Sequence, residues 1–161
     1  MRKILFGLLL FSFIYALGCK STTTGSGDEG ARAARDDLKT ISITITADTT
    51  TGKPKIEVSP ETLPLMYLVD KVHFVVYNNL QQEIKTVDID FGIKAPFDDN
   101  QRVFTIKSVP VGGSISRDTG VTKKINGIKE TDKYTVRGAL ADGTQIDQLD
   151  PQVEISGGRI K

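Results

Sequence analysis

Residues 71–77 read KVHFVVY, and this stretch decides the fold class. Val72, Phe74 and Val76 alternate with a second set of residues that is also largely apolar. A period of two predicts a β-strand rather than a helix, because successive side chains of a strand point to opposite faces. Two apolar faces further predict that this strand lies in the centre of a sheet.

The same period continues outward on both sides of residues 71–77. Residues 40–46 read TISITIT and alternate isoleucine with hydroxyl residues, as a half-buried strand does. Residues 121–128 give a weaker pattern that is typical of an edge strand, because Lys123 and Lys124 interrupt it. Five more strands are predicted between turn signals, at residues 55–58, 84–91, 102–109, 133–140 and 152–155. With the three segments above, the sequence predicts eight strands.

Short strands at this spacing, without a long helical period, predict an all-β fold. We expect an antiparallel Greek-key β-sandwich. The C-terminal part carries Tyr134-Thr135-Val136, an Asp142-Gly143 turn and a last strand led by Asp150-Pro151. These features resemble the final strands of immunoglobulin-like and cupredoxin-like domains, and the resemblance implies a sandwich of one of these two kinds. A blue-copper site needs a cysteine and two histidines, so the single histidine, His73, excludes that site.

The N-terminal segment carries the clearest functional signal. Arg2 and Lys3 precede an uncharged apolar run over residues 4–17, and Gly18 and Cys19 follow it. A basic start, an apolar stretch and a small residue are the parts of a secretory signal peptide. The run is shorter than the roughly 20 residues that a membrane-spanning helix needs.

Residues 16–19 read ALGC, which resembles the lipobox of bacterial lipoproteins. The resemblance implies cleavage between Gly18 and Cys19 and attachment of a diacylglyceryl group to the Cys19 thiol, with further acylation, for example by palmitate, of the new amino group. Ala16 at the −3 position and Leu17 at −2 depart from the usual box, and such relaxed boxes occur among spirochaete lipoproteins. An ordinary secretory peptide and an uncleaved anchor helix are the alternatives.

The sequence predicts three segments in the chain. Residues 1–18 are the predicted signal peptide, and residues 19–38 are the lipidated cysteine with a flexible tether rich in Ser, Thr and Gly. Residues 39–161 form a single β-sandwich domain, which is long enough to bury a core without disulfides. Lipidation of the only cysteine leaves no thiol for a disulfide.

The charge of the chain argues against nucleic acid as a partner. Loss of Arg2 and Lys3 with the signal peptide changes the formal net charge from +1 to −1. A nearly neutral protein lacks the basic surface that nucleic acid requires.

Candidate chemistry is limited to one histidine and several aspartates. His73 is expected to be a packed or rim residue of its strand, because it has no second histidine or cysteine for a metal or a nucleophile. The aspartates could provide Ca²⁺ ligands or a pair of hydrolytic carboxylates if they folded together. They lie in two groups, Asp88, Asp90, Asp98 and Asp99 with Asn100, and Asp142, Asp147 and Asp150.

The sequence therefore favours a non-enzymatic module, without a cofactor or a metal, that is anchored through Cys19. We expect it in the cell envelope, with another envelope or extracellular protein as its partner. The resemblance to lipoproteins of enteric bacteria, in which an aspartate after the cysteine retains the protein in the inner membrane, implies the outer membrane here, because Lys20 takes that position. The alternative is a Ca²⁺-dependent or hydrolytic module that uses the aspartate groups. An apolar ligand carrier is a third class of function.

Overall fold

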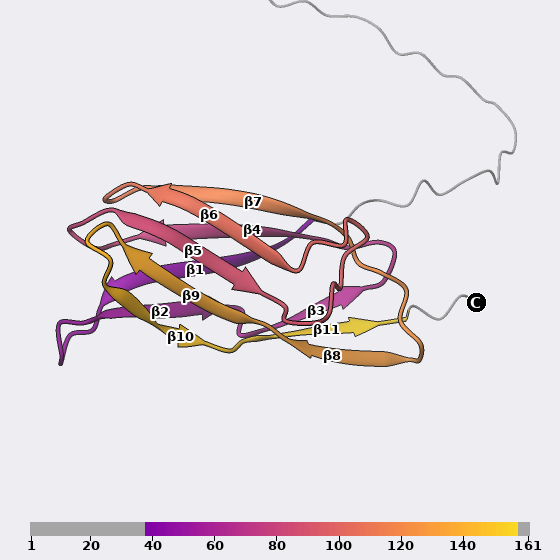
Figure 1. Ribbon diagram of the computed structural model, residues 1–161. Helices are drawn as coiled ribbons and strands as arrows, with labels where there is room; N and C mark the ends of the chain where they lie inside the picture. Colours follow the sequence, from indigo (N-terminus) through magenta and orange to yellow (C-terminus); the bar gives the residue numbers. More distant parts are fainter. Residues whose placement is uncertain (1–37, 158–161) are drawn as a thin grey trace, which may run out of the picture. The chain divides into compact units, whose positions relative to one another are not determined.

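The computed structural model describes residues 38–157 of the chain (Figure 1). The predicted signal peptide, Cys19 and all of the predicted tether except Leu38 lie outside the described residues. The described part consists of β-strands joined by turns and loops, so it contains no helix that could cross a membrane. The strands are β1 (Leu38–Ala47), β2 (Pro54–Ser59), β3 (Thr62–Met66), β4 (Lys71–Asn78), β5 (Ile84–Asp90), β6 (Val103–Val109), β7 (Ser114–Val121), β8 (Lys129–Lys133), β9 (Thr135–Leu140), β10 (Gln145–Leu149) and β11 (Gln152–Ser156).

These strands form three sheets that pack together, so the fold is the expected all-β sandwich. Sheet 1 has the order β2-β1-β4-β7, and sheet 2 has the order β10-β9-β5-β6. Sheet 3, with the order β3-β11-β8, extends to the right in Figure 1. As predicted, β4 lies inside sheet 1, between β1 and β7.

Two of the ladders are parallel, which the antiparallel prediction did not include. β1 runs parallel to β4, and β3 runs parallel to β11, whereas the other ladders are antiparallel. A parallel pair needs a crossover connection rather than a tight hairpin. β2 and β3 provide one between β1 and β4. The Greek-key connectivity and the choice between the two domain kinds stay predictions.

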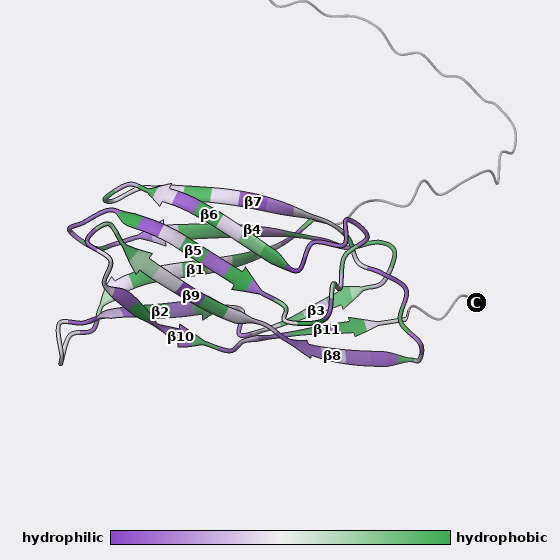
Figure 2. Cartoon of the chain, viewed as in Figure 1, coloured by the Kyte–Doolittle hydropathy of each residue, from purple (hydrophilic) through white to green (hydrophobic). Residues whose placement is uncertain are grey.

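The apolar residues of the alternating pattern lie in one core between the sheets. Figure 2 shows the alternation as bands of hydrophobic and hydrophilic residues along the strands. Ile41, Ile43 and Ile45 are completely buried, while the hydroxyl residues between them are partly exposed. In β4, the face that carries Val72, Phe74 and Val76 is completely buried. The second apolar face, which includes Tyr77, points outward, so it is not part of the core as the sequence had suggested.

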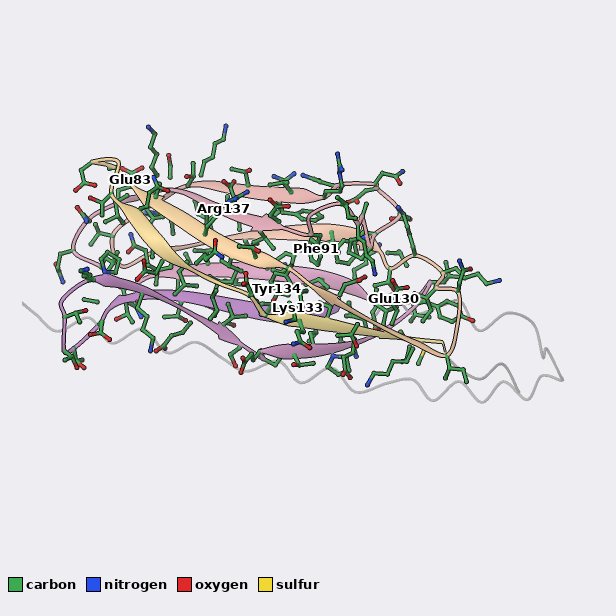
Figure 3. The ribbon with its side chains drawn as sticks, turned by 60° about the horizontal axis from the view of Figure 1, so that its bottom comes forward. Glu83, Phe91, Glu130, Lys133, Tyr134 and Arg137 are labelled. Atoms are coloured by element: carbon green, nitrogen blue, oxygen red, sulfur yellow. The ribbon has the colours of Figure 1, made fainter. Side chains whose placement is uncertain are left out.

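An aromatic cluster fills the centre of this core. Phe91 stacks on Tyr134 with ring centroids 5.1 Å apart (Figure 3), and Phe74, Phe97 and Phe104 complete the cluster. The Tyr134 hydroxyl has no hydrogen-bond partner among the described residues. Its burial raises the pKa of Tyr134 well above the ordinary tyrosine value.

The predicted strand at 121–128 is wrong. β7 ends at Val121, and beyond it Thr122 forms only an isolated bridge with Phe97. The following residues form a loop in which Gly127 takes a positive φ of 148°. The edge strand beside β4 is β7, which lies earlier, in a polar stretch of sequence that has little apolar alternation.

Three further strands were not predicted, β3, β8 and β10. Pro64 lies inside β3, and proline usually interrupts a strand because it lacks an N–H group. β3 is tolerated because it is the edge strand of sheet 3 and pairs only with β11. The predicted strand at 133–140 corresponds to β9, which begins at Thr135, and its first residue, Lys133, is the last residue of β8. Between the two strands, the Tyr134 N–H donates to the Pro151 carbonyl (3.1 Å).

Candidate functional site

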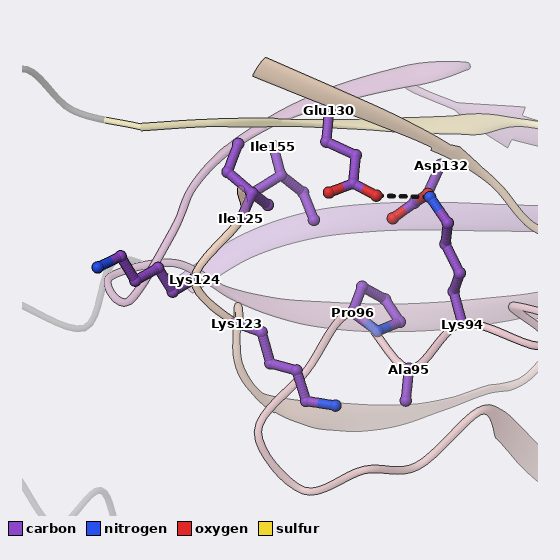
Figure 4. A pocket seen from close by; sticks show the side chains of 9 residues that line it. All are labelled: Lys94, Ala95, Pro96, Lys123, Lys124, Ile125, Glu130, Asp132 and Ile155. Carbon is purple, nitrogen blue, oxygen red and sulfur yellow. Dashed lines mark hydrogen bonds and ion pairs between the residues drawn. The ribbon is translucent and has the colours of Figure 1, made fainter. Parts of the chain in front are cut away.

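A cavity of about 260 Å³ lies where two loops meet sheet 3 (Figure 4). The loops follow β5 and β7, and two backbone hydrogen bonds hold them together. The Lys123 N–H donates to the Pro96 carbonyl, and the Asp98 N–H donates to the Val121 carbonyl, both at 2.8 Å. Since the loops are joined to each other and to sheet 3, the fold itself forms this cavity.

One wall of the cavity is an ionic cluster. The Lys94 ammonium lies 2.5 Å from Glu130 Oε1 and 2.5 Å from Asp132 Oδ1. The Asp132 side chain is only 6% exposed, whereas that of Lys94 is 51% exposed. Hydrogen bonds to Asp132 and then to Glu130 raise the pKa of Lys94 far above its ordinary value. Lys94 therefore neutralises a buried carboxylate while its stem borders the cavity.

The rest of the lining combines apolar side chains with a second lysine. Ile125 and Ile155 are buried and provide an apolar surface. The Lys123 ammonium donates to Asn100 Oδ1 at 2.8 Å, which leaves further protons of that ammonium for a ligand. Lys124 points away from Lys94 in Figure 4. An apolar surface with a few charged groups suits binding of a small polar group.

Substitution of Lys94 tests the ionic cluster. We expect Lys94→Met to destabilise the domain by about 1–2 kcal/mol, because the loss of the ammonium leaves Asp132 buried without its cation. The value is below that of a fully buried pair since water screens the half-exposed lysine. Urea unfolding measures the effect.

The matched control is Lys55→Met, which removes an ion pair between Lys55 and Glu57 that is more than half exposed on both sides. It should change the free energy of unfolding by under about 0.5 kcal/mol. The contribution of Lys94 should be complete below its ordinary pKa of 10.5 and should be lost as the pH rises through its higher folded-state pKa. Equal effects of the two variants at neutral pH would contradict this interpretation.

His73 lies on the outer face of sheet 1, in the inner strand β4, and its side chain is 28% exposed. Its Nδ1 contacts Asp118 Oδ1 on the neighbouring strand β7. On the other side of β4, His73 is paired with Thr40 of β1. Asp118 was not identified from the sequence, since it lies 45 positions away and only the register of β4 with β7 brings it near.

Three aspartates of the first group, Asp88, Asp90 and Asp99, use their side chains in contacts within the fold, and the fourth, Asp98, lies in the loop after β5. Asp88 accepts a hydrogen bond from the Thr105 hydroxyl at 2.7 Å, and Asp90 pairs with Arg137 at 2.7 Å. Asp99 accepts from the Gly120 N–H at 3.0 Å and from the Gln101 N–H at 2.9 Å. The Asn100 amide oxygen accepts from Lys123, as described above.

The second group is spread along the chain. Asp142 accepts from the Thr144 N–H at 2.9 Å in the turn between β9 and β10, and this hydrogen bond lowers its pKa. Asp150 accepts from the Thr135 hydroxyl at 2.9 Å, and Asp147 lies within β10. In residues 38–157, no group of three or more His, Cys, Asp or Glu side chains is placed to hold a metal ion.

The structure does not bring the sequence-predicted residues together into one site. Gly18 and Cys19 lie outside the described residues, and His73 is on sheet 1. The cavity was not predicted, because Lys94 lies 38 positions from Asp132. The sequence held one signal for the cavity, the lysines that interrupt the alternation at 121–128, because Lys123 and Lys124 both line it.

No protein-family model matches the chain, and no curated protein matches it.

Proposed function

We propose that this protein is a lipid-anchored, non-enzymatic binding module of the cell envelope. The observation that carries the proposal is the ALGC sequence at residues 16–19, directly after the uncharged run of residues 4–17. Cleavage before Cys19 and acylation of that residue would give two or more acyl chains. One chain gives only marginal membrane binding, while two hold a protein stably.

The folded domain supplies the binding part of this proposal. The cavity beside Lys94 combines an apolar surface with charged groups, which suits recognition of a polar group on a partner. The partner is another envelope or extracellular protein. The membrane is the outer one, by analogy with lipoproteins of enteric bacteria, because Lys20 stands where an aspartate would retain such a protein in the inner membrane.

Metabolic labelling with palmitate tests the anchor. Wild-type protein should incorporate the label, and Cys19→Ser should lose it completely because the thiol is the attachment point. Ser21→Ala is the matched control, since it changes a neighbouring residue without touching the thiol, and it should label like the wild type. Absence of label from the wild-type protein would reject the lipid anchor.

Photo-cross-linking in whole cells tests the binding part. A cross-linker placed at Lys123, in the cavity lining, should give one discrete adduct that disappears when Lys94→Met is added. The same cross-linker at Lys107, an exposed position in β6, is the control and should give no such adduct. The same adduct from both positions would show that the cavity does not select the partner.

A further inference from the structure

One end of the sandwich joins the first described residue to two loops and to the end of the last strand. In the ladders, Leu38 pairs with Lys71, at the start of β4. The Leu68 N–H donates to the Thr122 carbonyl at 2.8 Å, and the Gly157 N–H donates to the Ile128 carbonyl at 2.9 Å. We call this region the entry end, defined by Leu38, residues 66–71, residues 121–129 and residues 156–157.

The entry end carries several large apolar side chains that are exposed. Ile128 is 86% exposed and Leu68 is 54% exposed, and Leu38 and Met66 are about half exposed. At the opposite end of the sandwich, among the described residues, the turn after β6 exposes Val111. The entry end therefore presents apolar side chains from three separate segments, which is typical of a contact surface.

The backbone at Leu68 gives a second, independent observation. Leu68 has a φ of 57°, in the left-handed region that favours glycine. A leucine there is strained, and its side chain is half exposed, so the core does not account for its presence. A residue that costs stability without filling the core points to a role in contact with something outside the domain.

We propose that the entry end rests on the bilayer that holds Cys19, with Leu68 and Ile128 in the interface between headgroups and acyl chains. This inference rests on the proposed lipid anchor. Cys19 precedes Leu38 by only 19 positions in the sequence, so a lipid on Cys19 keeps Leu38, and with it the entry end, close to the headgroups. Lys124 is exposed in the same loop as Ile128 and is complementary in charge to anionic headgroups.

Fluorescence of an introduced tryptophan tests the contact, because the chain contains no tryptophan. The lipidated full-length protein carrying Ile128→Trp is reconstituted on vesicles of phosphatidylcholine and phosphatidylglycerol. We expect a blue-shifted emission and at least twofold quenching by brominated lipids. Val111→Trp is the control, at an exposed apolar position of the opposite end, and should show neither effect.

The outcomes separate the contact from the anchor. If the protein floats with the vesicles but the two variants give the same unquenched emission, the bilayer contact is wrong and the anchor stands. If the protein does not float with the vesicles, both proposals fail. A blue shift of Ile128→Trp that depends on protein concentration without vesicles would assign the surface to a second copy of the chain and overturn the proposal.

Leu68→Gly distinguishes a membrane role from a structural one. Glycine adopts the positive φ without strain, so the melting temperature should stay the same or rise. Quenching of Ile128→Trp by brominated lipids should nevertheless fall in the Leu68→Gly background. A lower melting temperature together with unchanged quenching would make Leu68 a structural residue and contradict the proposal.

Discussion

Replacing Phe104 by alanine should lower the free energy of unfolding by about 3–5 kcal/mol, the usual cost of truncating a buried aromatic residue. Phe104 is completely buried in β6 and contacts aromatic rings from several elements. Its ring centroid lies 5.7 Å from that of Phe97, 6.0 Å from that of Phe74 and 6.2 Å from that of Phe91. The Arg117 guanidinium lies over the same ring at 5.7 Å.

The cavity left by Phe104→Ala cannot close easily because these partners come from two different parts of the fold, sheet 1 and the loop after β5. Val103→Ala is the matched control, in the same strand at a partly exposed position, and should cost under about 1 kcal/mol. Both values come from urea unfolding with an unchanged m-value. A Phe104→Ala effect no larger than that of the control would show that the aromatic cluster does not form the core.

Replacing Asn78 by alanine should cost about 2–4 kcal/mol, because three backbone groups would lose their hydrogen-bond partner in the interior. Asn78 is completely buried at the end of β4. Its Nδ2 donates to the Gln82 carbonyl at 2.9 Å and to the Val109 carbonyl at 3.0 Å, and its Oδ1 accepts from the Leu80 N–H at 2.9 Å. One side chain thus joins sheet 1, the following turn and the end of β6.

The neighbouring residue provides a matched control for this experiment. Asn79 is exposed, and Asn79→Ala should change the free energy of unfolding by under about 0.5 kcal/mol. Asn78→Asp should be as harmful as Asn78→Ala, since a carboxylate cannot donate to the two carbonyls. If Asn78→Asp were tolerated, the donor role of the amide would be refuted.

The sequence predicts most of the fold because burial on one face produces a clear pattern. The isoleucines of residues 40–46 and the apolar set of residues 71–77 are buried where the period of two places them. Within the predicted strand at residues 133–140, the apolar residues Tyr134, Val136 and Leu140 are all buried. The pattern succeeds wherever a strand has one face toward the core.

The strands that were missed lack this signal for physical reasons. Pro64 in β3 reads as a strand breaker, but an edge position does not require its N–H. In β7, most residues are small or charged and only Thr119 is buried, so the alternation of apolar and polar residues is weak. Asn78 reads as a turn residue, and its buried hydrogen bonds depend on a partner 31 positions away.

The candidate cavity could not be predicted because its residues come from three distant segments. Lys94, Lys123 and Asp132 each resemble ordinary surface residues in the sequence. The pairing of β8 with β11 and the loop after β5 bring them together, and local sequence does not encode those contacts. The exposed apolar side chains of the entry end likewise come from segments that lie far apart in the sequence.

The central claim is that Cys19 carries the lipid that holds this β-sandwich at a membrane. Intact mass measurement of the protein extracted from membranes tests it most directly. We predict a mass that lacks residues 1–18 and carries added acyl groups on Cys19. A protein that retains Met1, or that has a free thiol at Cys19, would contradict the claim.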